Sequence, residues 1–164
     1  LQFLFFGSLM LVLTLIAFID WQHLIIPNKV ILFGIALGAL FIAAGWQTDI
    51  LLNSLIGLTG GTLVLMGIML IGNRLLRKET MGMGDIKLAG MIGFTVGLEG
   101  FLVSLWLAAI AGTLVGFVRI ALIGRRQDER LPFGSFMAGS TILYLILQLQ
   151  IQEWIQLWLT SALW

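Results

Sequence analysis

The sequence lacks cysteine altogether and contains one histidine and two prolines among its 164 residues. Without cysteine there can be no disulfide framework and no thiolate metal site. One histidine likewise excludes a histidine-based metal cluster, so neither a metal nor another cofactor is expected. Charged residues make up 10% of the chain, whereas soluble domains typically carry about 25%. Because 60% of the residues are hydrophobic, the composition indicates a membrane protein.

The hydrophobic residues gather into six segments. A helix of 19 residues rises about 28 Å, close to the hydrocarbon thickness of a bilayer. We therefore predict an all-α polytopic membrane protein, a bundle of six transmembrane helices. The fourth segment is too short to span a bilayer alone, so it must extend into its flanks or sit inside the bundle. The segments are residues 1–19, 30–46, 50–71, 86–98, 101–123 and 133–151.

The last residues, "QEWIQLWLTSALW", form a different pattern. Polar and apolar side chains alternate at helical spacing, and tryptophan favours the headgroup layer of a membrane. We predict an amphipathic helix lying in the interface over residues 152–164, after one transmembrane domain over residues 1–151.

The basic residues predict the orientation. In the six-span arrangement all nine Lys and Arg residues fall on one side, while Asp49, Glu99 and Glu153 lie on the other. Cytoplasmic loops are enriched in Lys and Arg, so the basic side is predicted to be cytoplasmic. The basic residues are Lys29, Arg74, Arg77, Lys78, Lys87, Arg119, Arg125, Arg126 and Arg130.

Glycines recur at spacings that place them on one helix face. Such small residues let helix backbones approach closely, so we predict helix packing. No Walker-type or dinucleotide-binding fingerprint accompanies them. The glycines are Gly34 with Gly38, Gly57 with Gly61, Gly90 with Gly93 and Gly97, and Gly112 with Gly116.

Two aspartates are candidates for chemistry. Asp20 directly follows an apolar run and Asp85 directly precedes one. On the six-span arrangement both lie at the cytoplasmic ends of helices, at similar depth. Each has a structural alternative: Asp85 as a helix N-cap and Asp20 as a solvated residue at a helix end. Two costly acids at matching depth nevertheless favour a functional site.

A facing pair of aspartates has a specific use. Two carboxylates a few ångströms apart cannot both ionise, so they hold one proton between them. The ionised member can take a proton from water while the protonated member donates to a carbonyl oxygen, which is general acid–base hydrolysis of a peptide. Gly82 and Gly84, just before Asp85, are expected to allow unusual backbone angles and close approach of a substrate. The loop 72–85 is expected to be a mobile gate.

Three motifs resemble those of the type IV prepilin peptidases. "GMGD" at residues 82–85 resembles the GxGD signature of intramembrane aspartyl proteases, and its continuation is similar to the second aspartate motif of the prepilin peptidases. "FIDWQHLIIPNKV" is similar to their first motif, and "LPFGSFMAGS" to their third landmark, a Pro-Phe-Gly turn. The motifs occur in the family's order over most of the chain.

This resemblance implies a bacterial inner-membrane endopeptidase of type IV pilus or type II secretion systems. It would cleave the short basic leader of prepilin or pseudopilin precursors at the cytoplasmic face. Its partners would be that substrate and membrane lipid, with no nucleic acid; the oligomeric state is left open. Asp20 and Asp85 would be the catalytic pair. The active-site loop would comprise Gly82, Met83, Gly84 and Lys87, and the candidate substrate-site turns Pro27, Asn28, Pro132, Phe133 and Gly134.

The chain departs from the family in two places. An N-terminal domain with paired CxxC motifs, associated with methylation, is absent, so methyltransferase activity is not expected. Either this is a minimal peptidase or the chain is part of a longer protein, and the first residue, Leu1 rather than methionine, favours the second. Ser135 stands where the family often has proline, a change not expected to abolish activity.

Two other functional classes stay open. A transporter could use Asp20 and Asp85 as ion or proton ligands, but it would need polar groups at the bilayer midplane and repeat symmetry. A catalytically silent scaffold of a secretion assembly is the other class, because positioning within an ångström decides activity.

Overall fold

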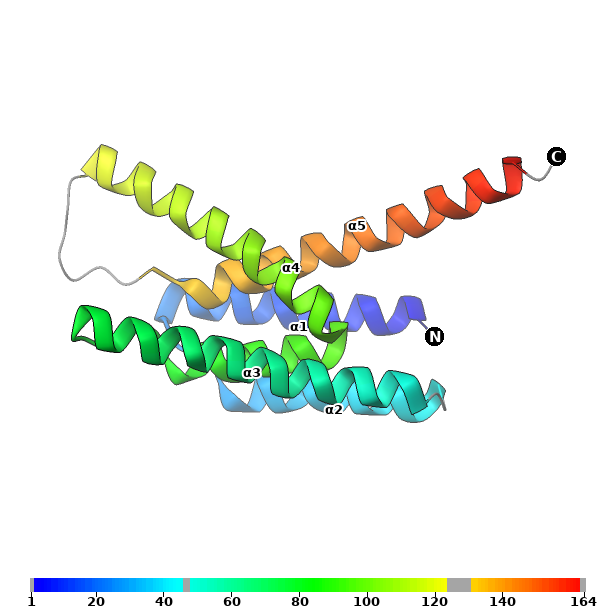
Figure 1. The fold of residues 1–164 in the computed structure, drawn as a ribbon, viewed down its shortest axis with the longest axis horizontal. Coiled ribbons are helices and arrows are strands. Elements are labelled where there is room, and N and C mark those ends of the chain that lie inside the picture. The colour runs from blue at the N-terminus through cyan, green and yellow to red at the C-terminus, as the bar shows by residue number, and fades with distance from the viewer. Residues whose placement is uncertain (1, 46–47, 124–130, 163–164) are drawn as a thin grey trace.

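The computed structural model describes residues 2–45, 48–123 and 131–162. Every regular element within these residues is an α-helix, which confirms the predicted all-α class. The helices are α1 (Gln2–His23), α2 (Asn28–Gly45), α3 (Thr48–Leu76), α4 (Met83–Ile123) and α5 (Phe133–Ala162), arranged as Figure 1 shows.

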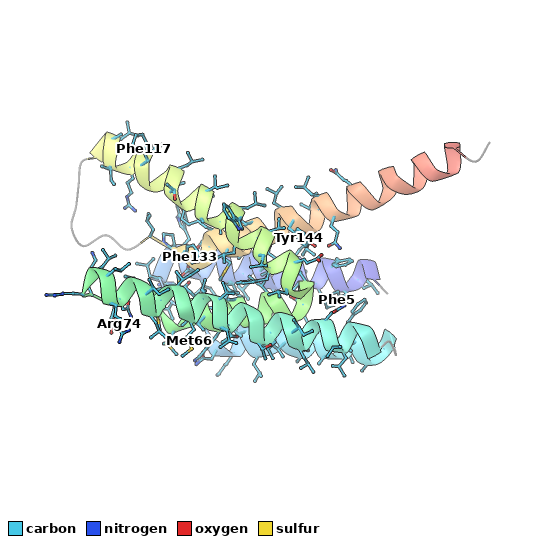
Figure 2. All side chains as sticks on the ribbon, in the orientation of Figure 1. Phe5, Met66, Arg74, Phe117, Phe133 and Tyr144 are labelled. Atoms are coloured by element: carbon cyan, nitrogen blue, oxygen red, sulfur yellow. The ribbon has the colours of Figure 1, made fainter. Side chains whose placement is uncertain are left out.

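The outer surface of the bundle is apolar. Exposed side chains such as Leu11 on α1 and Phe117 on α4 project from the helices, and Figure 2 shows Phe117 on the outer half of α4. Helices that expose apolar side chains while spanning bilayer length belong in lipid. Among the described residues, three stretches are long and apolar enough to cross a membrane, and two shorter apolar helices accompany them. The three are Leu4–His23, Leu51–Leu76 and Met83–Leu122, and the shorter two are Asn28–Ala44 and Phe133–Gln148.

Gly97 divides α4 into two helical segments. Its backbone angles, φ 77° and ψ 172°, are open essentially only to glycine. The chain reverses there, so that the first half of α4 runs beside α3 and the second half returns across the bundle (Figure 1). The predicted break at residues 99–100 thus lies at Gly97. The backbone of Gly97 also lies at the contact with α3, since a Cβ on Gly57 would lie 3.1 Å from its carbonyl carbon, although a Cβ on Gly97 itself would meet nothing within 4 Å.

The first half of α4 is the centre of the bundle. All residues from Leu88 to Phe94 are buried, whatever face of the helix they occupy. Helices α2, α3 and α5 pack against α4, and α1 packs against α2 and α5. The short fourth apolar segment is therefore covered by protein, one of the two arrangements expected from its length.

Glycines make the contact between α3 and α4. A Cβ on Gly57 would collide with the carbonyl oxygen of Gly93, and a Cβ on Gly93 would collide with that of Gly57. One turn along, a Cβ on Gly61 would lie 2.7 Å from the carbonyl oxygen of Ala89. The two backbones therefore touch, which confirms the packing role predicted for these glycines. Gly34 and Gly38 of α2 leave room for side chains of α4, Met91 and Phe94 respectively.

Helix α5 continues without a break to Ala162. The tail predicted to form a separate interfacial helix over residues 152–164 is thus the end of α5, which extends beyond the other helices in Figure 1. The side chains from residue 151 onward lie outside the described ones, so the domain boundary and the amphipathic face stay predictions.

We expect Gly57→Ala to destabilise the bundle by about 1–3 kcal/mol, because the added methyl group overlaps the backbone of α4. Gly67→Ala on the same helix is the matched control, since a Cβ there meets nothing within 4 Å. Thermal unfolding of the two purified variants in detergent would measure the difference. Equal midpoints would contradict the backbone contact.

Candidate active site

Three turns meet at one end of the bundle, on the left in Figure 1. They are the α1–α2 turn at residues 24–27, the α3–α4 turn at residues 77–82 and the entry to α5 at residues 131–132. Each turn carries one of the three motifs, so motifs far apart in the sequence share one region.

Ile26 lies at the centre of these turns and is buried. A Cβ on Gly84 would lie 3.2 Å from the Cβ of Ile26, and a Cβ on Gly134 would lie 2.6 Å from its Cδ1. Both glycines therefore provide room for the same side chain. Gly84 thus allows another residue to approach its backbone closely, although that residue is Ile26. The unusual backbone angles expected of Gly82 and Gly84 are absent, because Gly97 is the only described glycine with a positive φ. Sequence reasoning missed Ile26.

Asp20 lies in the last turn of α1, which continues to His23. Its side chain is 4% exposed, so the alternative of a solvated helix end is wrong. The Oδ2 atom accepts hydrogen bonds from the backbone N–H of Ser135 at 2.7 Å and from the Ser135 hydroxyl at 3.1 Å. Gly134 packs on the same carboxylate, where a Cβ would lie 2.9 Å from Oδ2. The Pro-Phe-Gly turn therefore holds Asp20.

Asp85 lies in the first turn of α4, at its third residue. Its Oδ2 accepts a hydrogen bond from the backbone N–H of Gly82 at 3.3 Å. This is the geometry of a carboxylate reaching back to the N-cap residue, so Gly82 rather than Asp85 occupies the N-cap position. Asp85 is half-buried, and it lies near enough to Asp20 for the two negative charges to repel each other. The two carboxyl groups thus lie at the same end of the bundle, with Ile26 packed against both Gly134, beside Asp20, and Gly84, next to Asp85.

Lys87 and Asn28 join α4 to α2. The Lys87 ammonium donates a hydrogen bond of 2.9 Å to Asn28 Oδ1, although both residues are exposed. Lys87 therefore ties the start of α4 to the first residue of α2. Pro27 lies just before α2, and its carbonyl oxygen accepts the N–H groups of Val30 and Ile31 in the first turn of that helix.

The start of α5 also follows a proline whose carbonyl oxygen accepts a hydrogen bond from the first turn of the helix. The carbonyl oxygen of Pro132 accepts the N–H of Phe136 at 3.4 Å, and Pro132 and Gly134 are buried. Phe133 is the first residue of α5 and is partly buried. This turn therefore packs into the bundle and carries Ser135 toward Asp20.

The loop predicted over residues 72–85 is shorter than expected. α3 continues to Leu76 and ends where Arg77 takes a positive φ of 50°. Thr80 is bound back to α3, because its N–H and its hydroxyl each donate to Asn73 Oδ1 at 2.8 Å. The turn before Asp85 is thus residues 77–82, tied at its middle to α3.

An apolar groove of about 570 Å³ runs between α2, α3 and α4. Three methionines line it, Met66, Met69 and Met83, and Figure 2 shows Met66 on α3. Asn28 and Lys87 also line it and form its polar end. Asp85 is not among the lining residues, because side chains two positions apart on a helix point to opposite sides. The groove therefore ends at the same end of the bundle as Asp85, on a different face of α4.

The model of the type IV leader peptidase family matches residues 7–117, more than half of the chain. This chain belongs to the type IV leader peptidase family. The match confirms the resemblance of the motifs and contains both Asp20 and Asp85. The Pro-Phe-Gly turn lies beyond the matched residues, but the structure attaches it to Asp20.

Several curated relatives are called prepilin leader peptidase/N-methyltransferase. The chain is 30% identical over 143 residues to that of Aeromonas salmonicida strain A449, which covers 87% of this chain and 49% of the relative. It is 28% identical to that of Xanthomonas campestris, over 81% of this chain and 47% of the relative. It is 26% identical to that of Legionella pneumophila, over 93% of this chain and 53% of the relative. The chain thus spans about half the length of these relatives. No solved structure matches it.

The convergence of the first two motifs can be tested by a disulfide, because the chain has no cysteine of its own. We expect Ile26→Cys combined with Gly84→Cys to cross-link readily under mild oxidation, since their Cβ atoms would lie 3.2 Å apart. The bond is read as a mobility shift after cleavage of the chain between the two positions. The control pair is Ile26→Cys with Gly67→Cys, because a Cβ at Gly67 has no neighbour within 4 Å. Equal cross-linking of both pairs would contradict this arrangement.

Proposed function

We propose that this chain is a membrane aspartyl endopeptidase that cleaves the short basic leader of type IV prepilin-like precursors. The observation that carries the proposal is the meeting of Asp20 and Asp85, from α1 and α4, in a chain of the leader peptidase family. The substrate class follows from the name of the family and of its relatives. Prepilins and pseudopilins both fit that class.

The pair would divide the chemistry of hydrolysis. The ionised carboxylate takes a proton from water as the water oxygen bonds to the scissile carbonyl carbon. The protonated carboxyl group donates to the carbonyl oxygen. The C–N bond then breaks as the amine nitrogen gains a proton. Since one member must be ionised and the other protonated, the pH–rate profile is expected to be bell-shaped.

Peptide cleavage is the activity assigned to this chain. The relatives' name also includes N-methyltransferase, but the family match lies over residues 7–117, around the two aspartates. The CxxC motifs associated with methylation in the family need cysteine, and the sequence has none. Methyl transfer is therefore not expected of this chain.

We keep the topology of six membrane spans as part of the proposal. Gly97 separates α4 into two segments of opposite direction, which with the other four helices makes six. Lys29, Arg77 and Lys87 lie at the end of the bundle where the three turns meet, whereas Glu99 lies by Gly97 at the reversal. By the positive-inside rule we place the active site at the cytoplasmic face of the bacterial inner membrane. Arg125, Arg126 and Arg130 lie outside the described residues.

The groove between α2, α3 and α4 is our candidate for binding the apolar segment of the substrate. Its length runs along the helices, and Asn28 and Lys87 line it at the end of the bundle where Asp85 lies in the first turn of α4. A substrate helix lying there would enter from the lipid and present its leader to the pair. Methionine side chains adapt their shape to different apolar partners, which suits a set of related precursors.

A transporter is less well supported by the positions of the polar groups. Both aspartates lie at one end of the bundle, beside the turns. The buried hydroxyls of Ser104 and Thr141 donate to carbonyl oxygens of their own helices, Gly100 and Met137 respectively. These hydroxyls satisfy their hydrogen bonds locally and need no transported ion.

The proposed function is tested first with Asp20→Asn and Asp85→Asn. We expect each to lower cleavage of a co-expressed prepilin by at least about 1000-fold, because each removes one half of the acid–base pair. Product mass measures the cleavage. Glu99→Gln, an exposed acid at the other end of the bundle, should leave it unchanged. Cleavage that survives either aspartate substitution, in folded protein, would refute the mechanism.

The groove is tested with two equivalent leucines of α2. Leu32 lines the groove and Leu40 does not, yet each is 68% exposed. We expect Leu32→Trp to raise KM for a full-length precursor roughly 10-fold by filling the groove, and Leu40→Trp to leave it unchanged. A short leader peptide without the apolar segment should be cut equally by both. Equal KM values for the full precursor would exclude this groove.

A further inference from the structure

Ser135 makes two contacts to one carboxylate oxygen. Its backbone N–H donates to Asp20 Oδ2 at 2.7 Å, and its hydroxyl lies 3.1 Å from the same atom. The two residues are 115 positions apart in the sequence, on α5 and α1. Hydrogen bonds donated to a carboxylate stabilise its ionised form.

We propose that Ser135 is a positioning residue that holds Asp20 as the ionised, water-activating member of the pair and leaves Asp85 to carry the proton. This inference rests on the proposed peptidase function. It adds the assignment of the two carboxyl groups to different steps of the reaction.

The hydrogen bonds of the two aspartates are unequal. The N–H of Ser135 lies within the 2.7–2.9 Å range of charge-assisted hydrogen bonds, roughly twice as strong as neutral ones. Asp85, by contrast, accepts one bond of 3.3 Å from Gly82 within the described part of the chain. Asp20 is therefore better placed to hold the negative charge.

Two effects oppose a charge on Asp20. It is buried, and it lies in the last turn of α1, where the helix dipole disfavours an anion. The first turn of α5 supplies the opposite field, because Ser135 is the third residue of that helix and its N–H points at the carboxylate. Burial also strengthens these hydrogen bonds. The contact with Ser135 thus offsets the location of Asp20.

The hydroxyl of Ser135 has a second acceptor. Its oxygen lies 2.8 Å from the carbonyl oxygen of Ala17, as well as 3.1 Å from Asp20 Oδ2. A hydroxyl has one proton, so it donates to one acceptor at a time. It can donate to Asp20 while that group is ionised. After Asp20 takes a proton from water, the hydroxyl can turn to Ala17 and its oxygen can accept from Asp20.

Other ionisable groups near Asp20 are few. α4 brings Asp85, which lies near enough for the two negative charges to repel each other. α2 brings Lys29 and α1 its own His23, and both are exposed. α5 has no Asp, Glu, Lys, Arg or His between residues 133 and 148. The hydrogen bonds of Ser135 therefore have to outweigh two differences that favour a charge on Asp85, its lesser burial and its place in the first turn of α4.

The test is the pH–rate profile of purified Ser135→Ala acting on a prepilin in detergent. We expect kcat to fall roughly 10-fold with KM little changed, since one donor to the base is lost. The acidic limb of the profile should then move to higher pH by roughly one unit. Ser135→Thr keeps the hydroxyl, so its acidic limb should lie at the same pH as that of the unaltered protein. Where Ser135→Ala folds poorly, Ser135→Cys replaces it, because a thiol donates weakly.

The control is Ser140→Ala, which removes another buried serine of α5 and should leave both limbs in place. An acidic limb unmoved in folded Ser135→Ala would overturn the proposal, and so would a shift of the basic limb alone. These results would leave the peptidase function standing, provided that Asp20→Asn and Asp85→Asn are inactive. Cleavage that survives those two substitutions would instead refute the function itself.

Discussion

The fold depends on the backbone contact between α3 and the first half of α4. Apolar surfaces gain little by leaving lipid for one another, so helices in a membrane associate through close packing. Gly57 and Gly93 allow that packing, because neither tolerates a Cβ without collision. The contact seats the first half of α4 inside the bundle, and Asp85 lies in its first turn. The packing of two glycines therefore sets where one of the two acids lies.

The second acid depends on a different element. Asp20 is buried near the end of α1, where an unpaired carboxylate would be costly. The first turn of α5 satisfies it through Ser135, and Gly134 leaves space for the carboxylate and for Ile26. Ile26 in turn packs against Gly84, next to Asp85. One isoleucine thus fills the space between the two motif turns that hold the aspartates.

Much of this arrangement could be predicted from the sequence. The apolar runs have bilayer length, and the helices follow them within a few residues, except that α3, α5 and the tail extend further than predicted. The two aspartates and the glycines of α3 and α4 stood out because acids are rare, and small residues recur, in apolar segments. The family resemblance rested on the three motifs and is confirmed by the family match.

The parts that could not be predicted depend on contacts between distant residues. Gly97 looks like its neighbours Gly90 and Gly93 in spacing, and only its backbone angles show that the chain also reverses there. Ile26 is one apolar residue among many until Gly84 and Gly134 are placed beside it. Ser135 looked like a neutral departure from proline. Its importance follows from its hydrogen bond to Asp20, which is 115 positions away in the sequence. The sequence around Ser135 gives no sign of that contact.

The unequal burial of the two aspartates bears on how a substrate would approach. Asp20 is covered by the entry to α5, whereas Asp85 is half-buried in the first turn of α4. A peptide that reaches this end of the bundle therefore has readier access to Asp85 than to Asp20. A proton donor should contact the carbonyl oxygen of the peptide, while the base needs to reach only a water molecule. The more accessible aspartate is thus suited to the acid, and the more enclosed one, held by Ser135, to the base.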